Sequence, residues 1–141
     1  LNLNIYRQEG VASSDVEVLS VQALDSSDNP KDIFHTGEDL KVRLKFKFRK
    51  QAADYSLWLG LFRMDEVYCH GVLRKMEEEI ILVYPKLPLL TGDYYFSLGI
   101  LEKDKREFSL YRHKAASFKM SFPGQDHGTA YLEHSWKWEL P

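Results

Sequence analysis

Short stretches in which apolar and polar residues alternate recur along the whole chain. The clearest is 40–49, LKVRLKFKFR, where five apolar residues alternate strictly with five basic ones. A period of two places the apolar side chains on one face of a strand, so this stretch predicts a half-buried β-strand. Similar runs predict strands at 16–24, 56–63, 67–73, 79–83, 93–101, 106–112 and 116–122. A change of phase at Val18–Leu19 predicts a β-bulge.

Turn-forming residues separate these runs, and no stretch carries the 3.6-residue apolar stripe of a long helix. Eight or nine short strands without helices predict an all-β fold, an antiparallel β-sandwich of immunoglobulin-like or jelly-roll-like type. We expect residues 1–14 to be a linker or tether and residues 15–141 to form the sandwich. Within it, residues 129–141 follow a hinge-like GQDHG segment and are expected to form the final strand.

Composition narrows the class of protein without naming a function. The 141 residues are 44% hydrophobic and 28% charged, with a net charge of −2, so nucleic acid is not an expected partner. A single cysteine, Cys69, excludes an internal disulfide and fits a reducing compartment. No apolar run reaches the roughly 20 residues that span a bilayer. The chain does not begin with Met, and we interpret it as a fragment of a longer or processed protein.

Catalytic motifs are missing from the sequence. The five histidines show no HExxH spacing, Cys69 has no CxxC partner, and neither a GxSxG elbow nor a glycine-rich phosphate loop occurs. The acidic run Glu77–Glu79 is more typical of a solvated loop than of a catalytic pair. We therefore predict a protein that is not an enzyme, with no catalytic residue and no metal site.

The basic positions of 40–49 have two interpretations. They would suit an anionic polymer, a lipid surface or an acidic partner domain. Alternatively, lysines on a sheet edge keep that edge from pairing with other chains. The acidic residues elsewhere in the chain favour the second interpretation.

Aromatic residues also occur at positions that alternation places on the outer faces of the strands. If Tyr94 points into the core, its neighbour Tyr95 faces outward. Flat rings suit the C–H faces of sugars, polar tips suit their hydroxyls, and glycines such as Gly60 and Gly99 would leave a groove between the rings. We predict a glycan-binding face made of Trp58, Phe62, Tyr68, His70, Arg74, Tyr95, Ser97 and Tyr111. On this hypothesis Tyr95→Ala weakens glycan binding and leaves folding largely intact. The alternative is that loops, a terminal segment or a second subunit cover these rings.

At LPLLTGDYYFSLGI the sequence resembles the C-terminal carbohydrate-binding domain of Wzt-type subunits, the ATP-binding proteins of O-antigen polysaccharide ABC transporters. The likeness extends from about Val16 to Trp138 and includes VEVLSVQALDSSDNP, FHTGEDLKVRLKFKF, LWLGLFRMDEVYCHGV, ASFKMSFPG and GTAYLEHSWKWEL. One departure is Cys69-His70-Gly71, where relatives carry a Gly-Thr-Asn type sequence, so the role of this strand in the site stays open.

The resemblance implies non-catalytic recognition of a lipid-linked polysaccharide for export, on the cytoplasmic side of the inner membrane. It implies a homodimer, whose last strand is exchanged in some members, together with the nucleotide-binding and membrane subunits of the transporter as partners. ATP and Mg²⁺ would bind only a nucleotide-binding domain that is absent here, so no cofactor is expected. The alternative functions are a protein-interaction or dimerisation sandwich, and an ancillary module of an extracellular carbohydrate-active enzyme.

Overall fold

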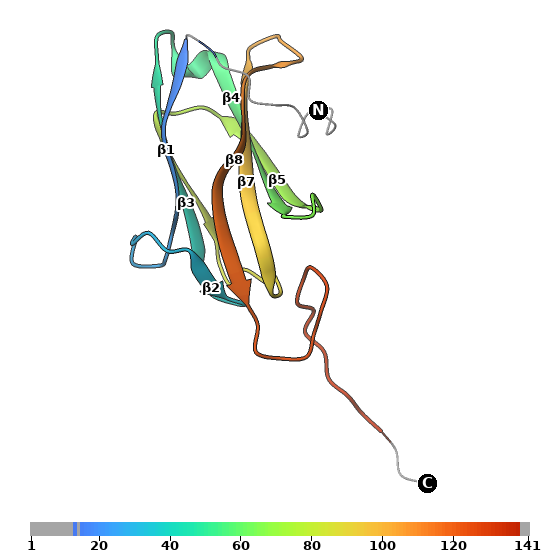
Figure 1. Ribbon diagram of the computed structural model, residues 1–141. Coiled ribbons are helices and arrows are strands. Elements are labelled where there is room, and N and C mark those ends of the chain that lie inside the picture. The colour runs from blue at the N-terminus through green and yellow to red at the C-terminus, as the bar shows by residue number, and fades with distance from the viewer. Residues whose placement is uncertain (1–12, 14, 139–141) are drawn as a thin grey trace.

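The described part of the chain folds into two β-sheets packed face to face (Figure 1). The computed structural model describes residues 13 and 15–138. One sheet has the order β1-β3-β6, formed by β1 (Val16–Leu24), β3 (Leu40–Phe48) and β6 (Glu79–Tyr84). The other has the order β2-β8-β7-β4-β5, formed by β2 (Ile33–His35), β8 (Phe108–Ser121), β7 (Gly92–Glu102), β4 (Tyr55–Arg63) and β5 (Tyr68–Lys75).

This architecture confirms the predicted all-β sandwich. The neighbouring strands pair antiparallel, except that the short edge strand β2 runs parallel to the end of β8. After β1 the chain crosses from the three-stranded sheet to the five-stranded sheet, where it forms β2, and it returns to the three-stranded sheet in β3. The register of β1 against β3 shifts between Val18 and Ser20, which confirms the predicted bulge.

The hydrophobic core lies between the two sheets and follows the alternation of the sequence. On β3, Leu40, Val42, Leu44 and Phe46 are buried. The facing positions of the five-stranded sheet are likewise buried, among them Leu57, Leu59, Leu61, Tyr94, Phe96, Leu98, Ile100, Leu110 and Phe118. Tyr94 therefore lies in the core, as predicted, and its hydroxyl donates a hydrogen bond to the Leu90 carbonyl at 2.7 Å.

The predicted strands at 106–112 and 116–122 form one long strand, β8, with irregular pairing to β7. The register shifts between Phe96 and Leu98, opposite the part of β8 that contains Lys114. Lys114 has a φ of 53°, in the left-handed region that non-glycine residues seldom adopt. Three residues of β8, 113–115, lie opposite the single residue Ser97 of β7, and the inner face continues from Leu110 to Phe118 across this irregularity.

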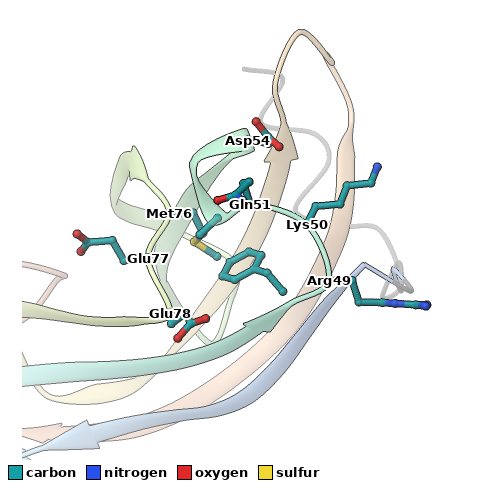
Figure 2. A pocket seen from close by; sticks show the side chains of 9 residues that line it. Arg49, Lys50, Gln51, Asp54, Met76, Glu77 and Glu78 are labelled. Carbon is teal, nitrogen blue, oxygen red and sulfur yellow. The ribbon is translucent and has the colours of Figure 1, made fainter.

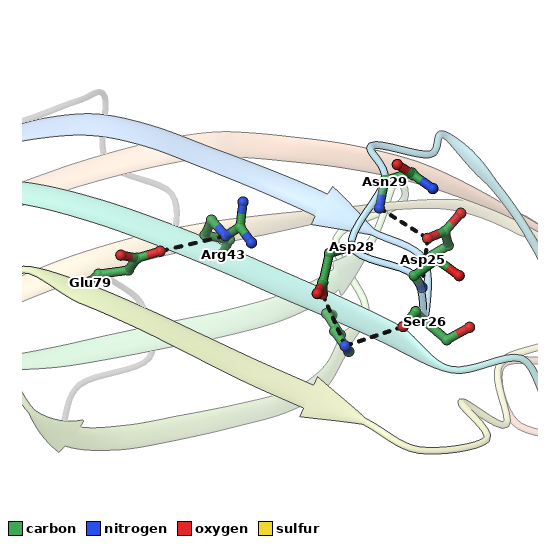
Figure 3. Close-up of polar contacts among 8 residues, drawn as sticks. Asp25, Ser26, Asp28, Asn29, Arg43 and Glu79 are labelled. Atoms are coloured by element: carbon green, nitrogen blue, oxygen red, sulfur yellow. Dashed lines mark hydrogen bonds and ion pairs between the residues drawn. The ribbon is translucent and has the colours of Figure 1, made fainter.

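The basic side chains of β3 point away from the core on the central strand of their sheet, so the interpretation as edge protection is wrong. Each has an acidic neighbour instead: Lys41 pairs with Asp28 at 2.9 Å and Arg43 with Glu79 at 3.6 Å (Figure 3). The strand register also places Lys47 opposite Glu17 and Lys45 opposite Glu79. The result is a ladder of mixed charge on the outer face of the three-stranded sheet.

After β8 the chain loops along the end of the sandwich and then runs away from it (Figure 1). Residues 129–131 are anchored, because the amide of Leu90 donates to the Thr129 carbonyl at 2.9 Å and the amide of Tyr131 donates to the Pro88 carbonyl at 2.6 Å. The described residues 131–138 form no strand, in contrast to the predicted final strand. A strand needs a neighbouring edge, and this segment leaves its own sandwich. The linker predicted for residues 1–14 lies almost wholly outside the described residues.

Candidate functional site

The predicted glycan-binding face is a buried aromatic layer. Trp58 and Phe62 on β4, Tyr95 on β7 and Tyr111 on β8 lie on the face of the five-stranded sheet that points away from the other sheet, as predicted. Their exposed fractions are only 2%, 0%, 0% and 1%, and Phe108 joins them at 7%. The face was thus assigned correctly, whereas the expected exposure to solvent was wrong. In this conformation these rings offer no surface to a sugar.

The rings of this layer pack on one another. Trp58 stacks on Phe108 and on Tyr111, with ring centroids 5.7 and 6.3 Å apart. Phe62 stacks on Tyr95 at 5.3 Å. Trp58 and Phe62 also meet edge to face at 6.2 Å, which joins the two stacks into one cluster. Offset-stacked and edge-to-face contacts between rings add to the stability that the rings gain from burial of their apolar surface.

The glycines expected to leave a groove are covered by these same rings. A Cβ atom added to Gly60 would lie 2.5 Å from the indole of Trp58 and 2.8 Å from the ring of Phe62. A Cβ added to Gly99 would lie 2.5 Å from the ring of Phe108. Because glycine has no side chain, each ring can lie flat on the sheet at these positions. The predicted groove is therefore filled.

Ser97, another predicted glycan contact, is fully buried, and its side chain forms a hydrogen bond with the irregular part of β8. Its hydroxyl accepts a hydrogen bond from the Lys114 amide at 3.1 Å and lies 3.4 Å from Nδ1 of His113. The His113 ring and the Lys114 ammonium both contact the ring of Tyr95. Burial raises the pKa of the Tyr111 phenol, against a smaller opposing effect of its hydrogen bond with Ser97. Ser97 thus serves the packing of β7 against β8.

The three predicted residues on β5 are the accessible ones, but only Tyr68 lies on the predicted face. Tyr68 is 37% exposed and packs on Phe62 at 5.0 Å, at the margin of the aromatic layer. A register shift opposite Leu61 and Phe62 makes Cys69 the extra residue of a bulge. His70 consequently pairs with Leu61, on the face toward the other sheet.

The bulge also reverses the expected phase of the rest of β5. Nδ1 of His70 lies 2.9 Å from the hydroxyl of Tyr84. Burial raises the pKa of the Tyr84 phenol to about 12. Arg74 pairs with Leu57 across the strands and forms an ion pair with Glu77 at 3.1 Å. Leu73, which precedes Arg74 in the chain, lies on the outer face instead and is 59% exposed. The prediction that His70 and Arg74 share a face with Tyr68 is wrong.

A cleft of about 710 Å³ opens at the end of the sandwich where β3 leads into β4 and β5 into β6 (Figure 2). It is lined by Phe48, Arg49, Lys50, Gln51, Ala52, Asp54, Met76, Glu77 and Glu78. Phe48 is half-buried and Met76 is buried, so the cleft combines an apolar surface with polar side chains. Its volume lies within the ~300–1,000 Å³ of small-molecule sites.

Sequence reasoning missed this cleft, although its parts were visible. Phe48 was assigned to the core as the last apolar position of the 40–49 pattern, and Glu77–Glu79 to a solvated loop. The signal in the sequence that could have indicated a cleft is an aromatic residue at the end of a strand, Phe48, followed by the polar segment Arg49–Gln51. Alternation shows that the strand ends there, but it does not show that a second loop lies opposite.

The described residues hold no metal-type cluster of three or more His, Cys, Asp or Glu side chains. Burial raises the pKa of the Cys69 thiol, so this thiol is not activated as a nucleophile at neutral pH. Within the described residues, no helix is long and apolar enough to cross a membrane.

Comparison with known proteins relates both the sequence and the fold to one family. The family model for the Wzt C-terminal domain matches residues 7–132. The crystal structure of the C-terminal domain of Wzt superposes with a TM-score of 0.74 at 10% identity, covering 94% of this chain and 89% of that chain. The CARDB domain of the Pyrococcus furiosus protein PF1109 covers 79% of this chain and 99% of its own at 10% identity, but its TM-score of 0.44 supports no inference. Among curated proteins, none matches. Because the family model matches most of the chain, this protein belongs to the Wzt C-terminal domain family.

Proposed function

We propose that this domain recognises the polysaccharide cargo of an O-antigen ABC transporter, without catalysing a reaction itself. The observation that carries the proposal is membership in the Wzt C-terminal domain family, which supports the O-antigen transporter context. In this proposal ATP and Mg²⁺ belong to a separate nucleotide-binding domain, and the partners are that domain and the membrane subunits. The place of action is then the cytoplasmic face of the inner membrane.

The structure changes which surface is the better candidate for polysaccharide binding. Five of the eight predicted contact residues are at most 2% exposed, which favours a structural role for them. Of the predicted residues, Tyr68 remains both accessible and on the aromatic face. The cleft at the end of the sandwich is a further candidate, because it combines an aromatic ring with several polar side chains.

The test is a titration of the isotope-labelled domain with O-polysaccharide released from the lipid of the source organism, followed through backbone amide shifts. Saturable shifts confined to one region support polysaccharide recognition and locate the surface. A spectrum unchanged up to the solubility limit of the polysaccharide would contradict the proposal. It would favour the alternative function of an interaction or dimerisation domain.

We further propose that the domain works as a homodimer in which the C-terminal segments are exchanged. The supporting observation is that Leu132, Trp136 and Trp138 are 75%, 86% and 79% exposed on a segment that leaves its own sandwich (Figure 1). Large apolar side chains are seldom exposed in this way unless a partner covers them. A second copy of the chain would do so with the symmetry usual for small oligomers.

Truncation after Tyr131 tests this exchange, because it keeps the anchored residues 129–131 and removes the exposed tryptophans. We expect the dimer to be lost, as measured by light scattering during gel filtration, while the thermal unfolding of the sandwich persists. The matched control is the full chain with Leu19→Ser, which changes a 53% exposed apolar residue on β1 and should remain dimeric. A truncated chain that is still dimeric would contradict the exchange.

A further inference from the structure

We propose that the cleft at the end of the sandwich, lined by Phe48, Gln51, Asp54 and Glu78, binds uncharged sugar residues of the polysaccharide. This inference rests on the proposed function and assigns it a site. It replaces the aromatic layer of the five-stranded sheet as the place where the polysaccharide is held.

The ring of Phe48 supplies the apolar surface of the cleft. It is half-buried and packs on Tyr55 and on Phe46, with centroid distances of 5.5 and 6.2 Å. Both neighbours are buried, so their packing against Phe48 fixes the orientation of its ring. Met76, also buried, lines the cleft beside it. A ring held in this way suits the C–H face of a sugar.

The polar side chains of the cleft match the hydroxyls of a sugar. Gln51 offers an amide that both donates and accepts, and Asp54 and Glu78 offer carboxylates that accept. Among the described residues, no hydrogen bond or ion pair engages the side chains of these three. Their hydrogen-bonding capacity is therefore available to a ligand.

The charges around the cleft disfavour an acidic sugar. Figure 2 shows Arg49 and Lys50 pointing away from the cleft, whereas Gln51 lies next to Met76 within it. The ammonium group of Lys50 also forms ion pairs with the carboxylates of Glu102 and Asp15, at 3.4 and 3.6 Å. The two cationic side chains thus point out of the cleft, whereas the carboxylates of Asp54 and Glu78 line it without a cationic partner in the described part of the chain. A uronic acid would meet like charge here, while a neutral sugar would not.

Backbone hydrogen bonds hold the two loops that form the cleft. The amide of Met76 donates to the Tyr55 carbonyl at 3.1 Å, and the amide of Phe46 donates to the Glu78 carbonyl at 2.8 Å. On the opposite side, the amide of Lys103 donates to the Asp54 carbonyl at 2.7 Å. The lining residues are thereby positioned before a ligand arrives, which lowers the entropic cost of binding.

The experiment measures the affinity of the whole domain for the delipidated O-polysaccharide by calorimetry, with variants in and outside the cleft. Gln51→Ala should weaken binding roughly three- to tenfold, the ratio expected for one or two lost hydrogen bonds. Phe48→Leu keeps an apolar side chain and removes the flat ring, and should weaken binding roughly tenfold. Gln22→Ala is the matched control, since Gln22 is exposed on β1 and lies outside the cleft. Circular dichroism melting confirms that each variant is folded.

The outcomes separate the site from the function. If the unaltered domain binds and both cleft variants bind equally well, the cleft is not the site, while polysaccharide recognition stands. Amide shifts centred on Tyr68 and Trp58 would lead to the same conclusion. If the unaltered domain does not bind, the proposed function fails and the cleft assignment fails with it. Affinity should be unchanged by added salt, and a steep decrease would overturn the assignment to uncharged sugars.

Discussion

Both faces of the five-stranded sheet carry a cluster of buried side chains, but the two clusters are built from different side chains. The inner face carries mainly aliphatic residues such as Leu57, Leu59 and Ile100, which meet the side chains of the three-stranded sheet. The outer face carries rings that lie flat over glycines, as Phe108 lies over Gly99. Side chains between two sheets fill a gap of about 10 Å and interdigitate. On the outer face the rings pack on one another and over glycines.

This difference teaches that aromatic residues at outward positions are not by themselves a binding surface. Strand alternation assigned Trp58, Phe62 and Tyr95 to the outer face correctly, yet they are nearly inaccessible. The outer layer is better described as a second, thinner core. The expectation that Tyr95→Ala would leave folding intact is accordingly replaced by the expectation of a marked loss of stability.

The largest effect is expected on the inner face. Phe96 is fully buried and stacks on Phe118 at 5.5 Å. Phe96→Ala should lower the free energy of unfolding by about 3–5 kcal/mol, because it removes a ring and leaves a cavity between two sheets. Urea unfolding measures this, with the exposed Lys47→Ala as a control expected to change stability by less than about 0.5 kcal/mol.

Trp58→Ala tests whether the outer layer contributes to stability as a core does. We expect it to lower the free energy of unfolding by about 3 kcal/mol, at the lower end of the range for large aromatic residues. The loss should be smaller than on the inner face because the exposed Tyr68 and Leu73 lie beside Trp58 and can settle into the space. The same urea series compares the two variants. A loss below about 1 kcal/mol would show that the layer is dispensable for folding, and would restore it as a candidate binding face.

Gly99→Ala tests the flat packing of rings over glycines. The added Cβ would lie 2.5 Å from the Phe108 ring, so the ring must tilt away, at an expected cost of about 1–3 kcal/mol. Gly92→Ala on the same strand is the matched control, since its Cβ would meet the Tyr94 ring at an ordinary 3.5 Å. Thermal melting of both variants gives the comparison. Equal melting temperatures would mean that Phe108 moves aside without cost.

The smallest effect concerns the phenols, and it depends on pH. Burial raises the pKa of the inner Tyr94 to about 12, from an ordinary value of 10. Because the folded state keeps this proton longer than the unfolded state, Tyr94 contributes its full stability below about pH 10. That contribution falls as the pH rises toward 12. Tyr94→Phe should flatten this fall, and should cost about 1 kcal/mol at neutral pH through loss of the hydrogen bond to Leu90.

Urea unfolding of Tyr94→Phe and the unaltered domain across the alkaline range measures this difference. The control is Tyr131→Phe, because Tyr131 lies beyond β8 on the C-terminal segment and is not part of a strand. An unchanged slope in Tyr94→Phe would assign the alkaline loss to other buried phenols, such as Tyr84.

The sequence by itself determined the fold class and the face of most core side chains. Alternation in 40–49 located β3 and its buried residues, and it separated Tyr94 from Tyr95 correctly. The phase change at Val18–Leu19 located the bulge of β1. These features are local, because the direction of a side chain on a regular strand follows from its neighbours in the chain.

The tertiary structure alone decided which strand lies beside which, and what covers each face. The central place of β3, the bulge at Cys69 that turned His70 inward, and the parallel pairing of β2 all depend on partner strands far away in the sequence. The cleft beside Phe48 exists because two loops meet at one end of the sandwich. Alternation states which way a side chain points, whereas burial depends on the residues that arrive opposite it, and those are brought there only by folding.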